Sequence, residues 1–550
     1  MNHTPVLIVG AGPTGLMLAC QLARFGIDFV IIDRKDGPTR ESRALVVQAR
    51  SLELYDALGV SDEALAEGRP AEAANLYVRR RRVQRVPLSE IGRNSTAYPF
   101  VLVLEQSKNE ALLLKRLEAS GRSVRWRTGL EQLTQDTGHV DVELRDADGN
   151  VEALRCDWLV GCDGARSVVR QQCGLEFAGG TYQNAFYVAD TGVDWDLPHG
   201  EVTVCLSRET FVLFFPMPGE RRYRVIGLFP ADRDGDGIED DEPGLITSGP
   251  GGAPLTFDDI AAAVQRQMDI PVRFHDTDWF SAYRVHHRCV ERFRAGRCFV
   301  AGDSAHIHSP VGAQGMNTGL QDASNLAWKL ALVARGRARP ALLDSYHDER
   351  WPIAQMLLRT TDTAFRFVIS RSAPVREFRL RVFPWLAAHV ASRPSVRRRL
   401  FRTVSQIGIR YRGSNVGANL LGATSPLTVR AGDRLPYALV DAPAAGGGPL
   451  STHRWLRAPC FHVLLMKRSG DLAPLVRQWH DQLDANYPGW FEVHPLSDHN
   501  GGVALLDAVE VADAAVLIVR PDQYLGYVAD RLDLDSVGAW IEAALQLERG

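Results

Sequence analysis

The chain opens with two short apolar runs separated by a glycine-rich turn and an amphipathic segment. Residues 5–10 (PVLIVG) form a continuous apolar run of the kind found in buried parallel strands, and residues 28–33 (DFVIID) form a second one. Between them, residues 14–26 (TGLMLACQLARFG) place Leu18 and Leu22 on one helical face and end at a glycine. The pattern predicts a strand–turn–helix–strand unit.

A different pattern begins near residue 180. The segments EVTVCLS, TFVLFFPMP and YRVIGLFP have the composition of strands and are separated by turns rich in Pro and Gly, which predicts an antiparallel sheet over 181–280. In the second strand, Phe211, Leu213 and Phe215 share one face, and the residues between them share the other. The alternation leaves open which face is turned inward.

The second half of the chain divides into a helical part and a final mixed part. Residues 315–400 are mainly helical, with one helix expected from Gly315 to about Arg335. A distinct unit over 415–550 contains the apolar runs CFHVLLMK and AAVLIVRP and ends in an amphipathic helix. The alternation of strands and helices predicts an α/β fold with a doubly wound sheet at its start.

Composition narrows the class of protein without identifying it. The chain has 550 residues, 45% of them hydrophobic and 23% charged, with a net charge of −3, so no nucleic-acid partner is indicated. The basic run at residues 79–82 is interpreted as a solvated hairpin. The eight cysteines show no C-x-x-C pair, no export signal is visible, and no apolar run reaches 18 residues. These features predict a cytoplasmic protein that does not enter a membrane.

The first turn carries the spacing of a dinucleotide-binding loop. Gly10 allows a tight turn, Gly12 lets a diphosphate approach the backbone, and Gly15 lets the helix pack closely on the strand. Pro13 opens that helix, whose N-terminus offers N–H groups to the diphosphate. Asp33 ends the second strand, where it can accept hydrogen bonds from a ribose.

Two more strands end in carboxylates. Asp163 follows the apolar run in DWLVGCDGARSVVR, and Asp303 follows the run in RCFVAGD. In a doubly wound sheet such strand ends line one crevice, so we expect Asp33, Asp163 and Asp303 to surround one ligand. Several contacts of this kind favour a long, tightly held nucleotide over a dissociable nicotinamide.

The stretch AGDSAHIHSP offers a second interpretation, a metal site. Asp303, His306 and His308 have the residue types of metal ligands, but the sequence offers no spaced third or fourth ligand. The alternative is that both histidines only form hydrogen bonds to the loop backbone. The acidic segment 232–242 imitates the start of a calcium loop, but Pro243 stands where a bidentate glutamate is required.

The motifs VGAGPTGL, VGCDGARSVVR and AGDSAHIHSPVGAQGMNTGLQDASNLAWKLA together resemble the single-component, FAD-dependent aromatic hydroxylases, especially the phenol, pentachlorophenol and polyketide hydroxylases. The resemblance implies an FAD-binding domain over 1–180 and 281–400, interleaved with a substrate-binding sheet over 181–280. It also implies a thioredoxin-like domain over 415–550, in which Cys460 has no redox partner. A homodimer is the family's usual state.

The resemblance also assigns residues. Arg34, Arg43 and Gln106 are expected to contact FAD, as are the residues at both nucleotide motifs and at the start of the predicted helix: Gly10, Gly12, Pro13, Gly15, Asp33, Asp163, Gly302, Asp303, Pro310, Gly315, Met316 and Asn317. Arg43 should face the flavin and the incoming nicotinamide, and the carbonyl of Pro310 should border the substrate ring. His306 and His308 should lie in the loop that rounds the isoalloxazine ring, so no metal is expected there.

The implied reaction is hydroxylation of a phenolic or polyketide-derived ring with O₂ and NAD(P)H, through a flavin C4a-hydroperoxide. Phenol hydroxylase has a carboxylate where this chain has Leu45, so the base that ionises the phenol must come from elsewhere. Tyr223 and His286 are the catalytic candidates, beside Tyr283 and His287, although core packing would explain each of them. Phe214, Phe215 and Tyr223 are expected to wall the substrate pocket.

Three other functions remain in view. A Baeyer–Villiger oxygenase acting on a polycyclic ketone would use the same fold. A flavin-dependent halogenase is disfavoured because no tryptophan lies in a W-x-W-x-I-P motif. A non-catalytic FAD- or metal-binding protein is disfavoured by the intact nucleotide motifs. The sequence does not distinguish NADH from NADPH.

Overall fold

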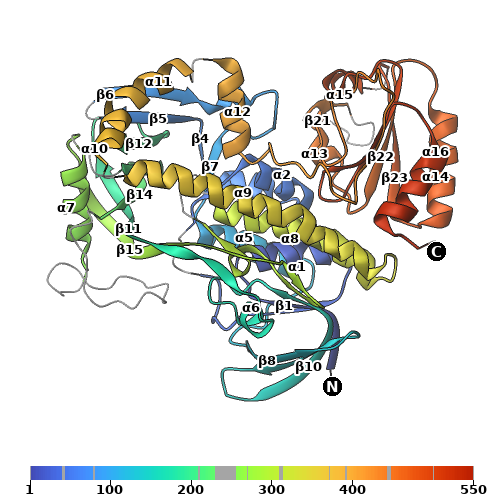
Figure 1. Ribbon diagram of the computed structural model, residues 1–550, viewed down its shortest axis with the longest axis horizontal. Coiled ribbons are helices and arrows are strands. Elements are labelled where there is room, and N and C mark those ends of the chain that lie inside the picture. The colour runs from blue at the N-terminus through green and yellow to red at the C-terminus, as the bar shows by residue number, and fades with distance from the viewer. Residues whose placement is uncertain are drawn as a thin grey trace.

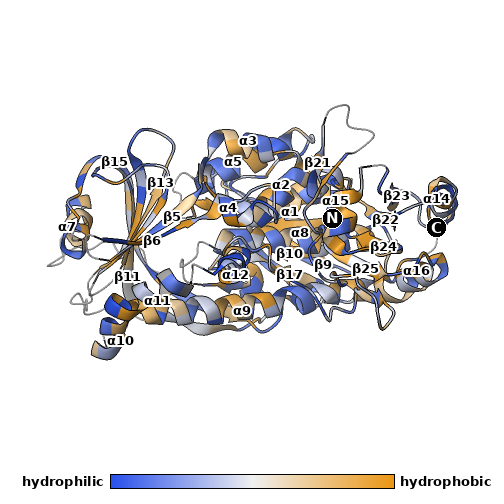
Figure 2. Ribbon diagram, turned by 90° about the horizontal axis from the view of Figure 1, so that it is seen from above, coloured by the Kyte–Doolittle hydropathy of each residue, from blue (hydrophilic) through white to orange (hydrophobic). Residues whose placement is uncertain are grey.

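In the part of the chain that it describes, the computed structural model contains three large sheets with their helices (Figure 1) and two small sheets. It describes residues 2–39, 44–78, 81–207, 211–229, 255–268, 270–308, 314–370, 372–390, 393–441, 448–499 and 501–548. In both overall views the eight-stranded sheet and the C-terminal unit lie at opposite ends of the long axis. Figure 2 shows hydrophobic residues concentrated between these ends, on the strands and helices of the first sheet.

The first sheet contains the predicted strand–turn–helix–strand unit. Its path runs β16 (Arg294–Ala295), β17 (Cys298–Val300), β10 (Val151–Gly161), β1 (Asn2–Val9), β2 (Phe29–Ile32). From β17 to β2 all neighbours are parallel, so these four strands end at the same edge. β8 (Gly129–Gln135) and β9 (Val140–Arg145) extend β10 as an antiparallel meander. The helices α1 (Pro13–Arg24) and α8 (Gly315–Ala334) pack side by side on this sheet.

The second sheet has eight strands and confirms the antiparallel pattern expected after residue 180. Its order is β18 (His306–Ile307), β15 (Arg273–Val290), β11 (Phe177–Asp194), β14 (Arg222–Leu228), β13 (Phe211–Pro216), β12 (Val202–Leu206), β5 (Ala73–Val78), β6 (Arg81–Pro87). Only the β12–β5 pair is parallel. The expected hairpin at the arginine run is present as β5 and β6. Both strands come from outside 181–280, so the sheet recruits a segment that the sequence pattern assigned to the first unit.

The two faces of β13 are now assigned. Val212 and Phe214 pack with Tyr223 beneath α7 (Phe257–Gln267), which covers the outer face of the sheet (Figure 1). Phe211 and Phe215 lie on the opposite face, in clusters that include residues of the first unit and of the long helix α9 (Asp344–Ile369).

The remaining helices frame this core. They are α2 (Ala49–Leu58), α3 (Ser61–Glu67), α4 (Leu88–Gly92), α5 (Gln106–Glu118), α6 (Val168–Gln172), α10 (Ala373–Glu377), α11 (Phe383–Val390) and α12 (Pro394–Val404). A small sheet joins β3 (Val46–Val47), β7 (Val101–Val103) and β4 (Arg69–Ala71). Within the described residues, no helix combines the length and apolar character needed to cross a membrane.

The C-terminal unit is a mixed five-stranded sheet with helices. Its strand order is β19 (Ala418–Leu420), β25 (Leu525–Ala529), β24 (Ala514–Val519), β22 (Phe461–Lys467), β23 (Phe491–Leu496). The helices α14 (Ala473–Asn486), α15 (Val503–Val509) and α16 (Leu534–Trp540) accompany it. Phe461 and Trp490 belong to the same apolar cluster as α1, and Phe25 stacks on Trp490 at 6.3 Å. The unit is therefore packed onto the first sheet's helices by a continuous core.

Candidate active site

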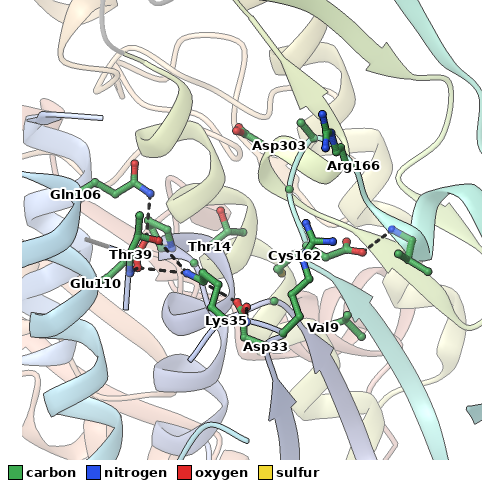
Figure 3. Close-up of a pocket in the computed structure, with 18 of the residues that line it drawn as sticks. Val9, Thr14, Asp33, Lys35, Thr39, Gln106, Glu110, Cys162, Arg166 and Asp303 are labelled. Carbon is green, nitrogen blue, oxygen red and sulfur yellow. Dashed lines mark hydrogen bonds and ion pairs between the residues drawn. The ribbon is translucent and has the colours of Figure 1, made fainter. Parts of the chain in front are cut away.

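A cavity of about 1270 Å³ opens where the parallel strands of the first sheet end, and it extends to β15 of the second sheet. Its lining combines residues from the N-terminal motif, from the ends of β2 and β10, from α5, from β15 and from the start of α8. Figure 3 shows Asp33, Asp303, Gln106 and Glu110 around this opening. The three predicted carboxylates, Asp33, Asp163 and Asp303, all line it.

The glycine motif is built as the sequence analysis expected. Gly10 has φ +106°, and a Cβ there would lie 2.3 Å from the carbonyl oxygen of Cys162. A Cβ on Gly15 would lie 1.9 Å from the carbonyl oxygen of Gly10, so Gly15 serves helix packing and does not line the cavity. Gly12 does line it, and a Cβ at Gly12 would meet nothing within 4 Å. The cavity therefore offers room for a phosphate at Gly12, beside the N-terminus of α1.

Asp33 orders the loop around the cavity as well as facing it. Its Oδ2 accepts a hydrogen bond from the backbone N–H of Ala11 at 2.7 Å, and its Oδ1 accepts one from Lys35 N–H at 2.9 Å. A carboxylate has about four lone-pair sites, so two remain for ribose hydroxyls. Arg34 and Pro13 line the cavity on either side of this residue.

Glu110 is a site residue that sequence reasoning missed. It is fully buried in α5, and its carboxylate accepts hydrogen bonds from Thr39 N–H at 2.8 Å and from Gln106 Nε2 at 2.9 Å. The ammonium of Lys35 lies 3.6 Å from it. Gln106 also accepts a bond from Ala44 N–H at 3.1 Å. Figure 3 shows this group on one wall of the cavity. The signal available in the sequence was a Glu four positions after Gln106, a spacing that places the two side chains next to each other on one face of a helix.

The second and third carboxylates differ in environment. Asp163 accepts bonds from Ser167 Oγ at 2.5 Å and Val168 N–H at 2.7 Å, so it caps α6 while it borders the cavity. Asp303 is exposed to the cavity. Gly302 does not line it. With φ +60°, Gly302 makes the turn beside Thr14 that aims Asp303 inward.

The start of α8 opens onto the cavity as expected. Gly315 and Met316 line it, together with Gln314. Asn317 does not. Its Oδ1 accepts bonds from Gln48 N–H at 2.8 Å and Ser51 Oγ at 2.7 Å, so its side chain anchors α8 to the segment before α2. The first-turn N–H groups of a helix have no partner within the helix and favour negative charge beside them.

The two histidines of AGDSAHIHSP have separate environments, although the loop that carries them borders the cavity through Asp303, Ile307 and His308. His306 is 2% exposed, and its Nε2 lies 2.7 Å from Asp322 Oδ2. Asp322 in turn accepts a bond from Arg350 Nε at 2.6 Å. His306 thus belongs to a buried charged network and is bonded to a carboxylate, not to the loop backbone. His308 lines the cavity.

His286 lines the cavity, and one of its ring nitrogens has no hydrogen-bond partner among the described residues. Its Nδ1 lies 2.7 Å from Thr181 Oγ1, whereas the buried Nε2 is the nitrogen without a partner in the described part of the chain. Burial, reinforced by the nearby Arg288 and His287, lowers the pKa of His286. Tyr283 and Leu45 line the same cavity. His287 points elsewhere and packs on Tyr182 at 4.6 Å.

Tyr223 and Phe214 are not part of this site, which corrects two of the expected substrate contacts. Both lie on the α7 side of the sheet, where Trp195 Nε1 donates a hydrogen bond to the Tyr223 hydroxyl at 3.2 Å. Strand alternation separates them from Phe215, which packs against Leu45 in the wall behind the cavity. Arg43 and Pro310, like the acidic segment 232–242, lie outside the described residues.

The donors and the space in this cavity fit FAD. A diphosphate has the open position at Gly12 and the first turn of α1, and a ribose has Asp33. The cavity then continues for a further ring system to α8, His308 and His286. The family described as "FAD binding domain" matches residues 3–361. The chain belongs to this family.

Relatives named as monooxygenases match much or nearly all of the chain. The 6-methylpretetramide 4-monooxygenase of Streptomyces rimosus is 34% identical over 98% of this chain and 93% of its own. The pentachlorophenol 4-monooxygenase of Sphingobium chlorophenolicum is 33% identical over 66% of this chain and 65% of its own. The solved structure of the anhydrotetracycline hydroxylase OxyS from Streptomyces rimosus superposes with a TM-score of 0.74 at 28% identity, covering 99% of both chains.

These comparisons confirm the prediction made from the motifs. The protein is a flavoprotein monooxygenase of the aromatic-hydroxylase type, with an α/β fold and FAD as its cofactor.

Proposed function

We propose that this monooxygenase hydroxylates a phenolic ring of a polycyclic, polyketide-type aromatic compound, with O₂ as co-substrate and NAD(P)H as a transient reductant. Relatives that act on tetracycline precursors match the chain over nearly its whole length, which supports the substrate class and favours ring hydroxylation over the Baeyer–Villiger alternative. The observation that carries the proposal is His286. His286 lines the end of the nucleotide cavity that lies against the sheet, and its buried Nε2 has no hydrogen-bond partner among the described residues.

The protein's first task is to hold the cofactor. Gly12 and the first turn of α1 would bind the diphosphate, and Asp33 the ribose. The start of α8, at Gly315 and Met316, would face the pyrimidine edge of the flavin. A helix N-terminus stabilises an adjacent negative charge by about 0.3–1 kcal/mol, and by up to about 2 kcal/mol when partly buried. When bound, FAD supplies the redox chemistry, accepting a hydride from NAD(P)H and delivering one oxygen atom of O₂ to the ring.

The second task is to take the proton of the phenol. A phenolate donates electron density to the reacting ring carbon far better than a phenol does, and a positioned base makes it. In the tautomer in which Nδ1 of His286 donates to Thr181 Oγ1, Nε2 carries the lone pair. The lowered pKa of His286 keeps the ring neutral at pH 7. Leu45, Val285 and Ile307 provide apolar walls that keep water from this end.

The test compares His286→Gln with His287→Gln, its neighbour that packs on Tyr182. A panel of phenols and polyketide-type aromatics is assayed for product, NAD(P)H consumption and hydrogen peroxide. We expect His286→Gln to bind FAD normally but to lose about 10²- to 10⁴-fold in hydroxylation, the range for one acid–base group. NAD(P)H oxidation should then release peroxide. His287→Gln should stay coupled.

The pH profile gives a second readout. Because burial places the pKa of His286 below its ordinary value, the base form predominates above about pH 6.5 and is lost as the pH falls further. The wild-type kcat/KM should therefore fall on the acid side, and His286→Gln should lack that limb. A coupled His286→Gln enzyme with the wild-type profile would disprove the assignment.

Finer features remain proposals of this kind. We propose that 415–550 is a thioredoxin-like domain, since its mixed sheet is flanked by helices, and that 1–180 with 281–400 and 181–280 are the FAD- and substrate-binding domains. Arg43 and Pro310 are proposed to border the flavin and the substrate. All eight cysteines are free thiols, in keeping with the reducing cytoplasm, and a homodimer is proposed.

A further inference from the structure

A cluster of metal-ligand side chains lies in the C-terminal unit, far from the cavity in sequence. Cys460 precedes β22, His462 is its second residue, and Glu492 and His494 lie on β23. The parallel register pairs His462 with Glu492. Side chains two positions apart share one face of a strand, so C-x-H on one strand and E-x-H on the next converge on one patch.

The ligand atoms of Cys460, His462 and Glu492 all lie within 4.8 Å of one another, as around one ion, and His494 lies beside His462 and Glu492. His462 Nδ1 lies 3.1 Å from His494 Nε2, 3.4 Å from Glu492 Oε2 and 4.0 Å from Cys460 Sγ. His494 Nε2 lies 3.6 Å from Glu492 Oε2. With Zn–N near 2.0–2.1 Å and Zn–S near 2.3 Å, a tetrahedral site places two light ligands about 3.3 Å apart and nitrogen and sulfur about 3.6 Å apart.

The surroundings prepare the ligands for a metal. His462 Nε2 lies 3.3 Å from the carbonyl oxygen of Ala458, so it is the donor nitrogen and leaves Nδ1 unprotonated toward the cluster. Bound metal deprotonates a coordinating thiol outright.

The exposure of these four side chains is that expected of a structural metal site that an ion can enter from one side. His462 is 1% exposed and Cys460 5%, while the side chain of His494 is 20% and that of Glu492 51% exposed. Trp455 covers the ring of His494 at 5.0 Å. Glu492 is thus the ligand through which an ion would enter.

We propose that Cys460, His462 and Glu492 form a Zn²⁺ site, and that His494 completes it as the fourth, tetrahedral ligand. Mixed sulfur and imidazole ligands with a carboxylate suit this borderline-soft ion, and four protein ligands make a closed, structural site. The ion ties β22 to β23 beside the contact between the C-terminal unit and α1, where Arg24 bonds to the carbonyl of Arg457. Its role is to stabilise the docking of this unit, separate from the flavin chemistry.

The test uses the FAD-loaded enzyme, stripped of metal with a chelator and titrated with Zn²⁺ against a competing chelator. One equivalent should bind and raise the melting temperature. Co²⁺ in place of Zn²⁺ should give ligand-field bands at wavelengths longer than the flavin absorbs, with the intensity of a tetrahedral site, and a thiolate charge-transfer band in the difference spectrum.

The control for Cys460→Ala is Cys205→Ala, because Cys205 is similarly buried but lies in β12 of the eight-stranded sheet. Cys460→Ala should lose the charge-transfer band and lower Zn²⁺ affinity by more than about 100-fold, beyond the range for partners outside the coordination shell. Glu492→Gln, at an exposed position that folding tolerates, should also weaken binding, and Cys205→Ala should not. Retained stoichiometric binding in Cys460→Ala, or a wild-type protein that takes up no Zn²⁺ or Co²⁺, would overturn the proposal in favour of a metal-free His462–His494 hydrogen bond.

Discussion

Gly12 is the position where cofactor binding and folding are most cleanly separated. Its backbone is extended (φ −78°, ψ −175°), a conformation that alanine adopts without strain, and an added Cβ would meet nothing within 4 Å. The methyl group of Gly12→Ala would therefore leave the apoprotein intact. Lower chain entropy in the unfolded state should even stabilise it by about 0.4–1 kcal/mol.

The same methyl group occupies the space that a phosphate needs. Loss of one hydrogen bond to a charged group costs about 1.5–3 kcal/mol. At about 1.4 kcal/mol per decade, this corresponds to a Kd for FAD raised about 10- to 150-fold. Gly15→Ala provides the contrast, because its Cβ would lie 1.9 Å from the carbonyl oxygen of Gly10 and must push α1 away from β1.

The assay is a titration of apoprotein with FAD, followed by flavin fluorescence, alongside a thermal melt of each apo variant. We expect Gly12→Ala to melt at or slightly above the wild-type temperature and to bind FAD more weakly. Gly15→Ala should melt at a lower temperature. Wild-type FAD affinity in Gly12→Ala would refute the placement of the diphosphate. A large drop in the melting temperature of this variant would refute the claim that the folded chain leaves room for a methyl group at Gly12.

Two further predictions concern buried charges. Arg224→Met removes both 2.6 Å hydrogen bonds to the buried Asp190, so the free energy of unfolding measured from thermal melts should fall by about 3–5 kcal/mol. Adding Asp190→Asn should restore part of that stability. An Arg224→Met variant as stable as the wild type would contradict the prediction. Burial lowers the pKa of His453 to about 3. As the pH falls, the imidazole of His453 is protonated in the unfolded state before it is protonated in the folded state. The free energy of unfolding therefore falls between pH 6.5 and 3, and this group accounts for a loss of about 2 kcal/mol at pH 5. Melting temperatures of His453→Gln should therefore fall less steeply with acid than those of the wild type.

The sequence by itself determined the parts of the site that depend on local pattern. The strand–turn–helix–strand unit, the glycine spacing and the helix beginning at Gly315 follow from short-range periodicity and turn chemistry. The meeting of Asp33 and Asp303 followed too, because parallel strands of one sheet end at the same edge.

Only the tertiary structure decided which face of a strand looks where. Alternation showed that Phe214 and Phe215 point oppositely, but the packing of α7 on one face placed Phe214 and Tyr223 outside the site. In the same way, C-x-H and E-x-H are unremarkable until strand pairing brings His462 beside Glu492. Periodicity fixes relative directions within one strand, whereas strand register and the choice of buried face are set by the whole core.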